Sequence, residues 1–242
     1  MKIAVISDIH ANSWALQAVL EDIGNRDISQ TYDLGDTLYG PLDPAGTYRL
    51  LQKKQIQSIK GNQDRFILEN KIPSLTFDYV IKSLRGTGAI QWLQTLPFSR
   101  TIEGRILLCH GTPENDSEYL LENVKSGYFT YEKSAVLEAK LDAHPQDIIC
   151  CGHSHVPGVV RAGRKTLINP GSIGLPAFDD ESPVYHQMES GSPMARYCII
   201  TFNGDLKSVD MIAVAYDAEA AAACAEKNKR TDWANWIRTG RA

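Results

Sequence analysis

The sequence has no apolar run that approaches the roughly 20 residues needed for a membrane-spanning helix. Its N-terminus opens into a strand-like run and lacks the basic segment, apolar core and cleavage site of a secretory leader. Basic residues are not in excess, since 25 Lys and Arg stand against 29 Asp and Glu, for a net charge of −4 at pH 7. These absences exclude a membrane partner and argue against nucleic acid.

Cysteine is scarce, with five residues in a chain of 242. The odd number does not suit a framework of disulfides, and four of the five lie inside apolar runs: Cys109, Cys150, Cys151 and Cys198. Buried, reduced thiols are typical of proteins in the reducing cytosol. We therefore expect a cytoplasmic protein.

The chain does have an average globular composition, 43% hydrophobic and 22% charged, and it is long enough to bury a full core. Short apolar runs alternate with amphipathic segments, and antiparallel strands are expected towards the C-terminus. Strands are expected at 2–7, 31–34, 56–60, 105–109, 147–151, 158–161, 165–168, 195–202 and 207–215, and helices at 12–23, 44–54, most of 64–96, 131–141, 217–229 and 232–238. The pattern predicts one α/β domain over residues 1–242, a parallel half followed by an antiparallel meander and a C-terminal helix.

Five of the expected strands lead into polar residues that can bind metal. The residues are Asp8, His10, Asp36, Asn62, His110, His153 and His155. Sites in open α/β sheets form outside the carboxyl ends of the strands, so these side chains are expected to converge at one edge. Within the pairs Asp8/His10 and His153/His155 the spacing is two residues, which places both side chains on one side of an extended backbone.

Seven nitrogen and oxygen donors exceed what one ion usually takes from a protein. They suit two divalent ions that share a bridging carboxylate and keep open positions for water and substrate. Imidazole and carboxylate donors without thiolate favour Mn²⁺, Fe, Zn²⁺, Co²⁺ or Ni²⁺, with manganese as the first choice. Glycines stand beside the donors, where a tight turn or a close approach of the backbone is expected: Gly35, Gly61, Gly111 and Gly152.

The series resembles the calcineurin-like metallophosphoesterase superfamily, especially its small bacterial and archaeal phosphodiesterase-like members. The motifs that carry the resemblance are Asp8-Ile-His10, Gly35-Asp36, Gly61-Asn62-Gln63-Asp64, His110-Gly111, Gly152-His153-Ser154-His155 and the loop Asn169-Pro-Gly-Ser172. The match covers about residues 1–175 well and 176–242 weakly. It implies a β-sandwich flanked by helices, with two metals at the edge formed by the strand C-terminal ends.

The resemblance also implies roles for single residues. Asp8, His10 and His155 would hold one ion, Asn62, His110 and His153 the other, and Asp36 would bridge them. A hydroxide between the ions would attack phosphorus in line, with Asp36, Asn62 and Gln63 at the catalytic centre. The implied activity is hydrolysis of phosphodiesters or nucleotides. A phosphomonoesterase or protein phosphatase on the same metal core, and a metal-binding scaffold without catalysis, are the alternatives.

Three features leave the substrate open. Gln63 stands where many family members have a histidine, and its amide can donate a hydrogen bond to substrate but cannot deliver a proton at neutral pH, so alkyl leaving groups should turn over poorly. Asn12 either contacts substrate or caps the first helix. Segment 177–193 is expected to be a long loop that either covers the site or is an ordinary acidic surface loop. A small phosphoester or nucleotide is the expected substrate, and a homo-oligomer is left open.

Overall fold

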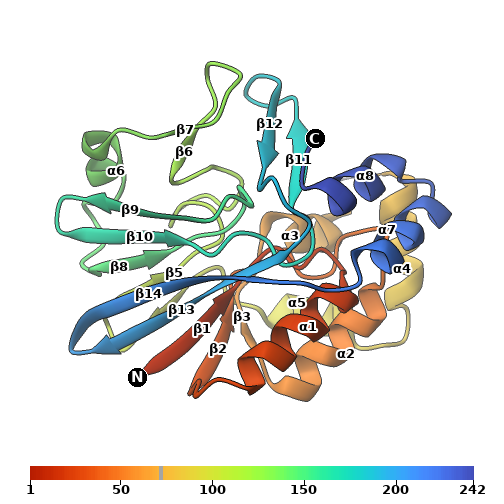
Figure 1. Cartoon of the computed structure of the whole chain (residues 1–242), viewed down its shortest axis with the longest axis horizontal. Helices are drawn as coiled ribbons and strands as arrows, with labels where there is room; N and C mark the ends of the chain where they lie inside the picture. Colours follow the sequence, from red (N-terminus) through yellow and green to blue (C-terminus); the bar gives the residue numbers. More distant parts are fainter. Residues whose placement is uncertain (71–72) are drawn as a thin grey trace.

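Two five-stranded sheets form the centre of the molecule (Figure 1). The structure, a computed structural model, describes residues 1–70 and 73–242. The first sheet has the order β14-β13-β1-β2-β3, with β1 (Lys2–Ile6), β2 (Gln30–Asp33), β3 (Gln57–Ser58), β13 (Ala195–Asn203) and β14 (Asp205–Val214). The second has the order β4-β5-β8-β10-β9, with β4 (Arg100–Ile102), β5 (Ile106–Leu108), β8 (Ile148–Cys150), β9 (Gly158–Ala162) and β10 (Lys165–Asn169).

The two sheets pack face to face through alternate residues of their strands. Ile3 and Val5 of β1 lie in one buried cluster with Leu108 and Ile148 of the second sheet, whereas Ala4 of β1 belongs to a cluster on the opposite face. Such alternation follows from the two-residue period of a strand. At roughly 25 cal/mol per Å² of apolar surface, this interior is a major source of the fold's stability.

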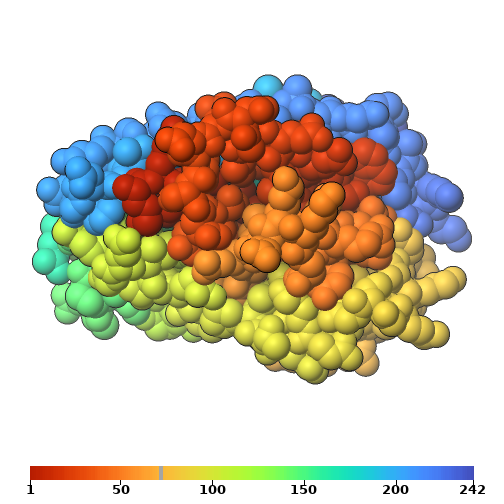
Figure 2. All heavy atoms as spheres, turned by 90° about the horizontal axis from the view of Figure 1, so that it is seen from below, coloured from red at the N-terminus to blue at the C-terminus, as the bar shows by residue number. Residues whose placement is uncertain are grey.

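Helices cover the outer faces. The first sheet is covered by α1 (Ser13–Gly24), α2 (Pro44–Lys54), α4 (Leu75–Leu84) and α5 (Ala89–Thr95), and α3 (Asn62–Glu69) follows β3. The second sheet is covered by α6 (Ser134–Lys140), and α7 (Ala218–Lys227) packs with α8 (Thr231–Thr239) near the C-terminus. In Figure 2 the N-terminal elements, red to yellow, make up most of one face. The expected helix-flanked β-sandwich is confirmed.

The structure corrects the sequence-based assignment in several places. The strands expected as one meander belong to different sheets, because β10 pairs in parallel with β8 while β13 pairs antiparallel with β1. The helix expected from residue 131 begins at Ser134, since β7 (Thr130–Tyr131) pairs with β6 (Glu122–Asn123). The strand expected over 56–60 is only two residues long. Residues 71 and 72, within the helical stretch expected over 64–96, lie outside the described residues.

The segment expected as a long loop, 177–193, instead contains a β-hairpin of β11 (Ala177–Asp180) and β12 (His186–Glu189). In Figure 1 this hairpin and the β6–β7 hairpin project at the same end of the molecule. All five cysteines are free, and the four expected to be buried are buried. In the described part of the chain, no helix combines the length and the hydropathy that crossing a membrane requires.

Candidate metal centre

The seven predicted donors come together where β1, β2, β3, β5 and β8 end. The expectation that the pairs Asp8/His10 and His153/His155 lie on an extended backbone is wrong. Asp8, His10, His153 and His155 have φ of 54°, 48°, 67° and 61°, and Asp36 has φ of 55°. Such left-handed conformations cost non-glycine residues on the order of 1–3 kcal/mol each and cluster at functional sites. Five of the seven donors therefore sit on strained turns just beyond the strands, whereas Asn62 begins α3.

Close backbone approach explains two of the flanking glycines. A Cβ at Gly61 would lie 2.2 Å from Asp36 Oδ1, and a Cβ at Gly152 would lie 2.7 Å from Asp8 Oδ2. Both contacts are shorter than van der Waals distance. A side chain at either position would push a carboxylate out of the donor set.

The first group of donors consists of Asp8, His10 and His155, whose ligand atoms lie within 4.8 Å of one another. Nδ1 of His10 donates to the Tyr39 carbonyl at 3.2 Å, and Nδ1 of His155 donates to the Leu175 carbonyl at 2.6 Å. Because a carbonyl only accepts, Nδ1 carries a proton in each ring, and Nε2 is the nitrogen that faces the other donors. The two Nε2 atoms face each other at 3.0 Å, and Asp8 Oδ1, buried without a hydrogen-bond partner, lies 3.4 Å from His155 Nε2. Three acceptors that face one another fit a cation.

The second group consists of Asp36, His110 and His153, again within 4.8 Å. His110 Nδ1 donates to the Leu34 carbonyl at 2.9 Å, so Nε2 is the ring nitrogen that faces the group. That Nε2 lies 2.9 Å from Asn62 Oδ1 and 3.4 Å from Asp36 Oδ2. The amide oxygen of Asn62 thus joins the group as a fourth oxygen or nitrogen donor.

The two groups adjoin. Asp8 Oδ1 of the first lies 4.0 Å from His110 Nε2 of the second. Burial raises the pKa of Asp36, but His110 from one group and His10 from the other outweigh it and lower the pKa. Asp36 therefore interacts electrostatically with both groups, and its Oδ1 accepts the backbone N–H of Gln63 at 2.8 Å.

The electrostatics of the cluster favour positive charge. Burial lowers the pKa of both His10 and His153 to about 4, so these imidazoles are neutral at pH 7. Burial also disfavours charge on His110, but Asp36 and Asp8 outweigh it and raise the pKa of His110 to about 10. A buried pair of carboxylates that attracts a proton onto a neighbouring imidazole also attracts a divalent ion.

Asp64 holds two of the donor loops in place. Its Oδ1 accepts from the backbone N–H of Thr37 at 3.0 Å and from the Thr37 hydroxyl at 2.8 Å, and its Oδ2 accepts from the N–H of Gly61 at 3.1 Å. Thr37 follows Asp36, and Gly61 precedes Asn62. Burial, followed by the charge of Asp36, raises the pKa of Asp64 to about 6. Sequence reasoning included Asp64 in a motif but gave it no role.

The loop that begins at Asn169 braces the other donors. The Asn169 amide donates to the Gly152 carbonyl and to the Ser154 hydroxyl, both at 2.9 Å, and the Ser172 hydroxyl donates to the Asp8 carbonyl at 2.7 Å. Outer partners of this kind orient metal ligands. The loop that matched the family by sequence therefore contacts the segment that carries Asp8 and the segment that carries His153 and His155.

Asn12 does not face the open site. It is fully buried, its Oδ1 accepts from the Ala15 N–H at 3.1 Å as the N-cap of α1, and its amide donates to the Gly174 carbonyl at 3.0 Å. Both polar ends are occupied, so the structure favours the capping interpretation and speaks against the predicted substrate contact. Gln63, by contrast, lines a cavity of about 300 Å³ together with Asp36 and His155.

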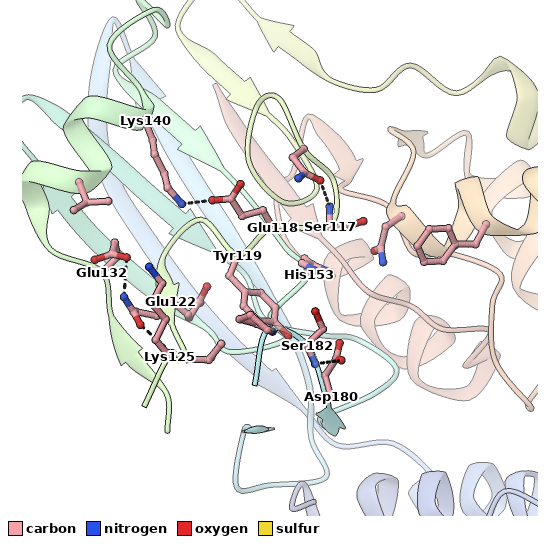
Figure 3. A pocket seen from close by; sticks show the side chains of 17 residues that line it. Ser117, Glu118, Tyr119, Glu122, Lys125, Glu132, Lys140, His153, Asp180 and Ser182 are labelled. Carbon is pink, nitrogen blue, oxygen red and sulfur yellow. Dashed lines mark hydrogen bonds and ion pairs between the residues drawn. The ribbon is translucent and has the colours of Figure 1, made fainter. Parts of the chain in front are cut away.

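Two cavities open over the donors. The smaller one also has the aromatic walls Phe178, Trp233 and Trp236. The larger one, of about 590 Å³, reaches Asn62 and His153 and is drawn in Figure 3. Its wall includes Tyr119, and Tyr119 contacts His186, which a sequence reading as part of a loop places in solvent but which is fully buried. Sequence reasoning gave neither residue a role, because neither belongs to a motif and only the tertiary structure brings them to the site.

The fold and the donor set together define a helix-flanked β-sandwich with a candidate metal centre at one edge. The family model of the calcineurin-like phosphoesterase superfamily domain matches residues 1–191, and the chain belongs to this superfamily. The expected family is confirmed, and the match extends past residue 175.

Relatives agree over nearly the full chain. An uncharacterised protein of Methanocaldococcus jannaschii is 29% identical over an alignment that covers 96% of this chain and 94% of the relative. A crystal structure of a metallophosphoesterase from Sphaerobacter thermophilus aligns with a TM-score of 0.74 at 24% identity, over 97% of this chain and 99% of the other. That of a hypothetical protein from Pyrococcus horikoshii gives 0.76 at 20% identity, over 99% and 98%. These structures share the fold.

Proposed function

We propose that this protein is a phosphodiesterase that uses two divalent metal ions, with manganese as the first candidate. One observation supports the proposal above all. Two adjoining groups of donors, most of them buried, direct imidazole nitrogen and carboxylate oxygen atoms at one another, at distances such as 3.0 Å between His10 Nε2 and His155 Nε2. Positive charge among the donors would offset the burial of the two carboxylates, and the chain belongs to the calcineurin-like phosphoesterase superfamily.

The donor set fits two ions. Asp8, His10 and His155 would hold one, Asn62, His110 and His153 the other, and Asp36 would serve both. Bound ions supply an activated water at neutral pH and neutralise charge on the phosphoryl oxygens.

The protein's own residues fix the donors and shape the space around the phosphate. Backbone carbonyls accept from Nδ1 of His10, His110 and His155, which leaves Nε2 of each ring as the nitrogen available to a metal ion. The Gln63 side chain lines the smaller cavity and offers a hydrogen bond but no proton. Substrates with acidic leaving groups are therefore expected to react fastest.

The test compares bis-p-nitrophenyl phosphate with p-nitrophenyl phosphate. Metal-stripped protein is assayed alone, with Mn²⁺ and with Zn²⁺, and Asp36→Asn is the matched control because it removes the charge and keeps the size. The proposal expects diester turnover that requires both the metal and Asp36. Faster turnover of the monoester would support a phosphomonoesterase on the same metal core. Metal binding without turnover of either ester would support the scaffold interpretation.

The cytoplasmic location of the protein and its assembly into a homo-oligomer remain predictions.

A further inference from the structure

The β11–β12 hairpin divides the opening over the donors into two cavities. Phe178 of the hairpin lines the smaller cavity, Pro183 lines the larger one, and Asp180 lines both. Both cavities reach Asn62 and His153. A phosphoryl group at these donors therefore has one cavity on each side of the hairpin.

The hairpin is held against the donor groups at two points. Phe178 packs edge-on against His155, with ring centroids 4.6 Å apart. On the other side, the Tyr119 ring lies 4.9 Å from the His153 ring, and its hydroxyl is 3.0 Å from His186 Nε2. Because His186 Nδ1 donates to a backbone carbonyl at 2.7 Å, the Tyr119 hydroxyl is the donor in this bond. The partition is thus anchored on an imidazole from each group.

The larger cavity has the size and lining of a small-molecule site. Its volume of about 590 Å³ lies within the range of about 300–1,000 Å³ that such sites span. Phe66, Val124 and Val136 give it apolar walls, and the ion pair of Lys140 with Glu118 at 2.5 Å lies on its wall (Figure 3). Tyr119 lies next to His153 and offers an aromatic face. A methyl group would leave this space almost empty, whereas a nucleoside has both the size and the mixed polarity to fill it.

We propose that the larger cavity is a specificity pocket that binds one organic substituent of a phosphodiester, a group of nucleoside size, while the other substituent occupies the smaller cavity. This inference rests on the proposed function. It adds that the preferred substrates are diesters with one bulky substituent, and that the segment over 177–193 selects them by separating the two substituents.

The test uses two diesters with the same leaving group, methyl p-nitrophenyl phosphate and thymidine 5′-(p-nitrophenyl phosphate). Two variants fill the cavity from opposite walls, Val136→Trp on α6 and Ser182→Trp on the hairpin. Both positions are exposed, so neither substitution has to disrupt the core. The matched control is Val159→Trp, at an exposed valine of β9 that is 47% accessible and away from the cavity wall.

We expect the wild type to prefer the nucleoside ester by at least about tenfold in kcat/KM, and each filling variant to remove most of that preference by raising KM for the nucleoside ester more than for the methyl ester. Val159→Trp should keep the wild-type preference. Equal kcat/KM for the two esters in the wild type, or filling variants without effect, would refute the proposed pocket.

Calorimetry with thymidine 5′-methylphosphonate separates this failure from that of the proposed function. If no ester reacts, but this ligand binds the wild type and binds Val136→Trp about tenfold more weakly, the result supports the proposed pocket and refutes the proposed phosphodiesterase activity.

Discussion

Removal of the metal ions should lower the thermal stability of this protein by a large and calculable amount. His10 Nε2 and His155 Nε2 face each other at 3.0 Å in the folded chain, and Asp8 Oδ1 is buried without a hydrogen-bond partner. The unfolded chain does not assemble these donors. Metal ions therefore bind the folded state preferentially and stabilise it.

The magnitude follows from mass action. An ion present at 100 times its dissociation constant stabilises the folded state by about 2.7 kcal/mol, so two ions contribute about 5 kcal/mol. In a chain of 242 residues, 1 kcal/mol shifts Tm by roughly 2–4 °C. Saturating Mn²⁺ should thus raise the Tm of the metal-stripped protein by roughly 10–20 °C.

The assay is differential scanning fluorimetry over a Mn²⁺ series, with the metal content counted by mass spectrometry. Asp36→Asn should lose most of the shift and retain less than one ion per chain, because Asp36 interacts with both donor groups. Asn62→Ala should lose about half. His144→Gln, which removes a histidine that bonds Glu114 outside both groups, should behave like the wild type. Two tightly held ions in Asp36→Asn, with an undiminished shift, would refute the shared role of Asp36.

Four further predictions concern single residues. Asp64→Asn cannot accept all three hydrogen bonds from Thr37 and Gly61, so metal affinity measured by calorimetry should fall roughly 10–100-fold, and an unchanged affinity would contradict the positioning role. Gln63→His supplies a proton donor beside Asp36 and should raise turnover of alkyl diesters by up to about 10²–10⁴-fold relative to p-nitrophenyl diesters; equal effects on both would count against it. Asn12→Ala should destabilise the fold by about 1–2 kcal/mol in chemical denaturation and leave KM unchanged, whereas a raised KM would restore the substrate contact. Burial raises the pKa of Glu122 from an ordinary 4.5 to about 8, so the folded state binds more protons than the unfolded state between these values and stability must fall as pH rises through that window. The Tm of the wild type relative to Glu122→Gln should therefore decline from pH 5 to pH 8, and parallel Tm profiles would exclude this linkage.

Much of the fold could be predicted from local patterns, and the errors have a common cause. Helix α2 was expected over 44–54 and is found there, because Pro44 at its first turn and the spacing of apolar residues are local signals. The partners of β10 and β13 could not be predicted, since strands of similar composition can pair with several others. The hairpin of β11 and β12 was expected as a loop, because its acidic, proline-containing sequence gives no strand signal and its pairing depends on packing against Tyr119 and His155.

The sequence by itself determined which residues could serve as metal donors and in what order they occur. Polar residues directly after buried strands have few structural reasons to be there, and five such places in one chain indicate a common site. Only the tertiary structure decided how that site works. It sets the left-handed turns at Asp8 and His10, the carbonyls that fix the imidazole tautomers, the brace from Asp64 and the hairpin that divides the opening. These features join residues far apart in the chain, and contacts of that kind depend on the packing of whole sheets rather than on local spacing.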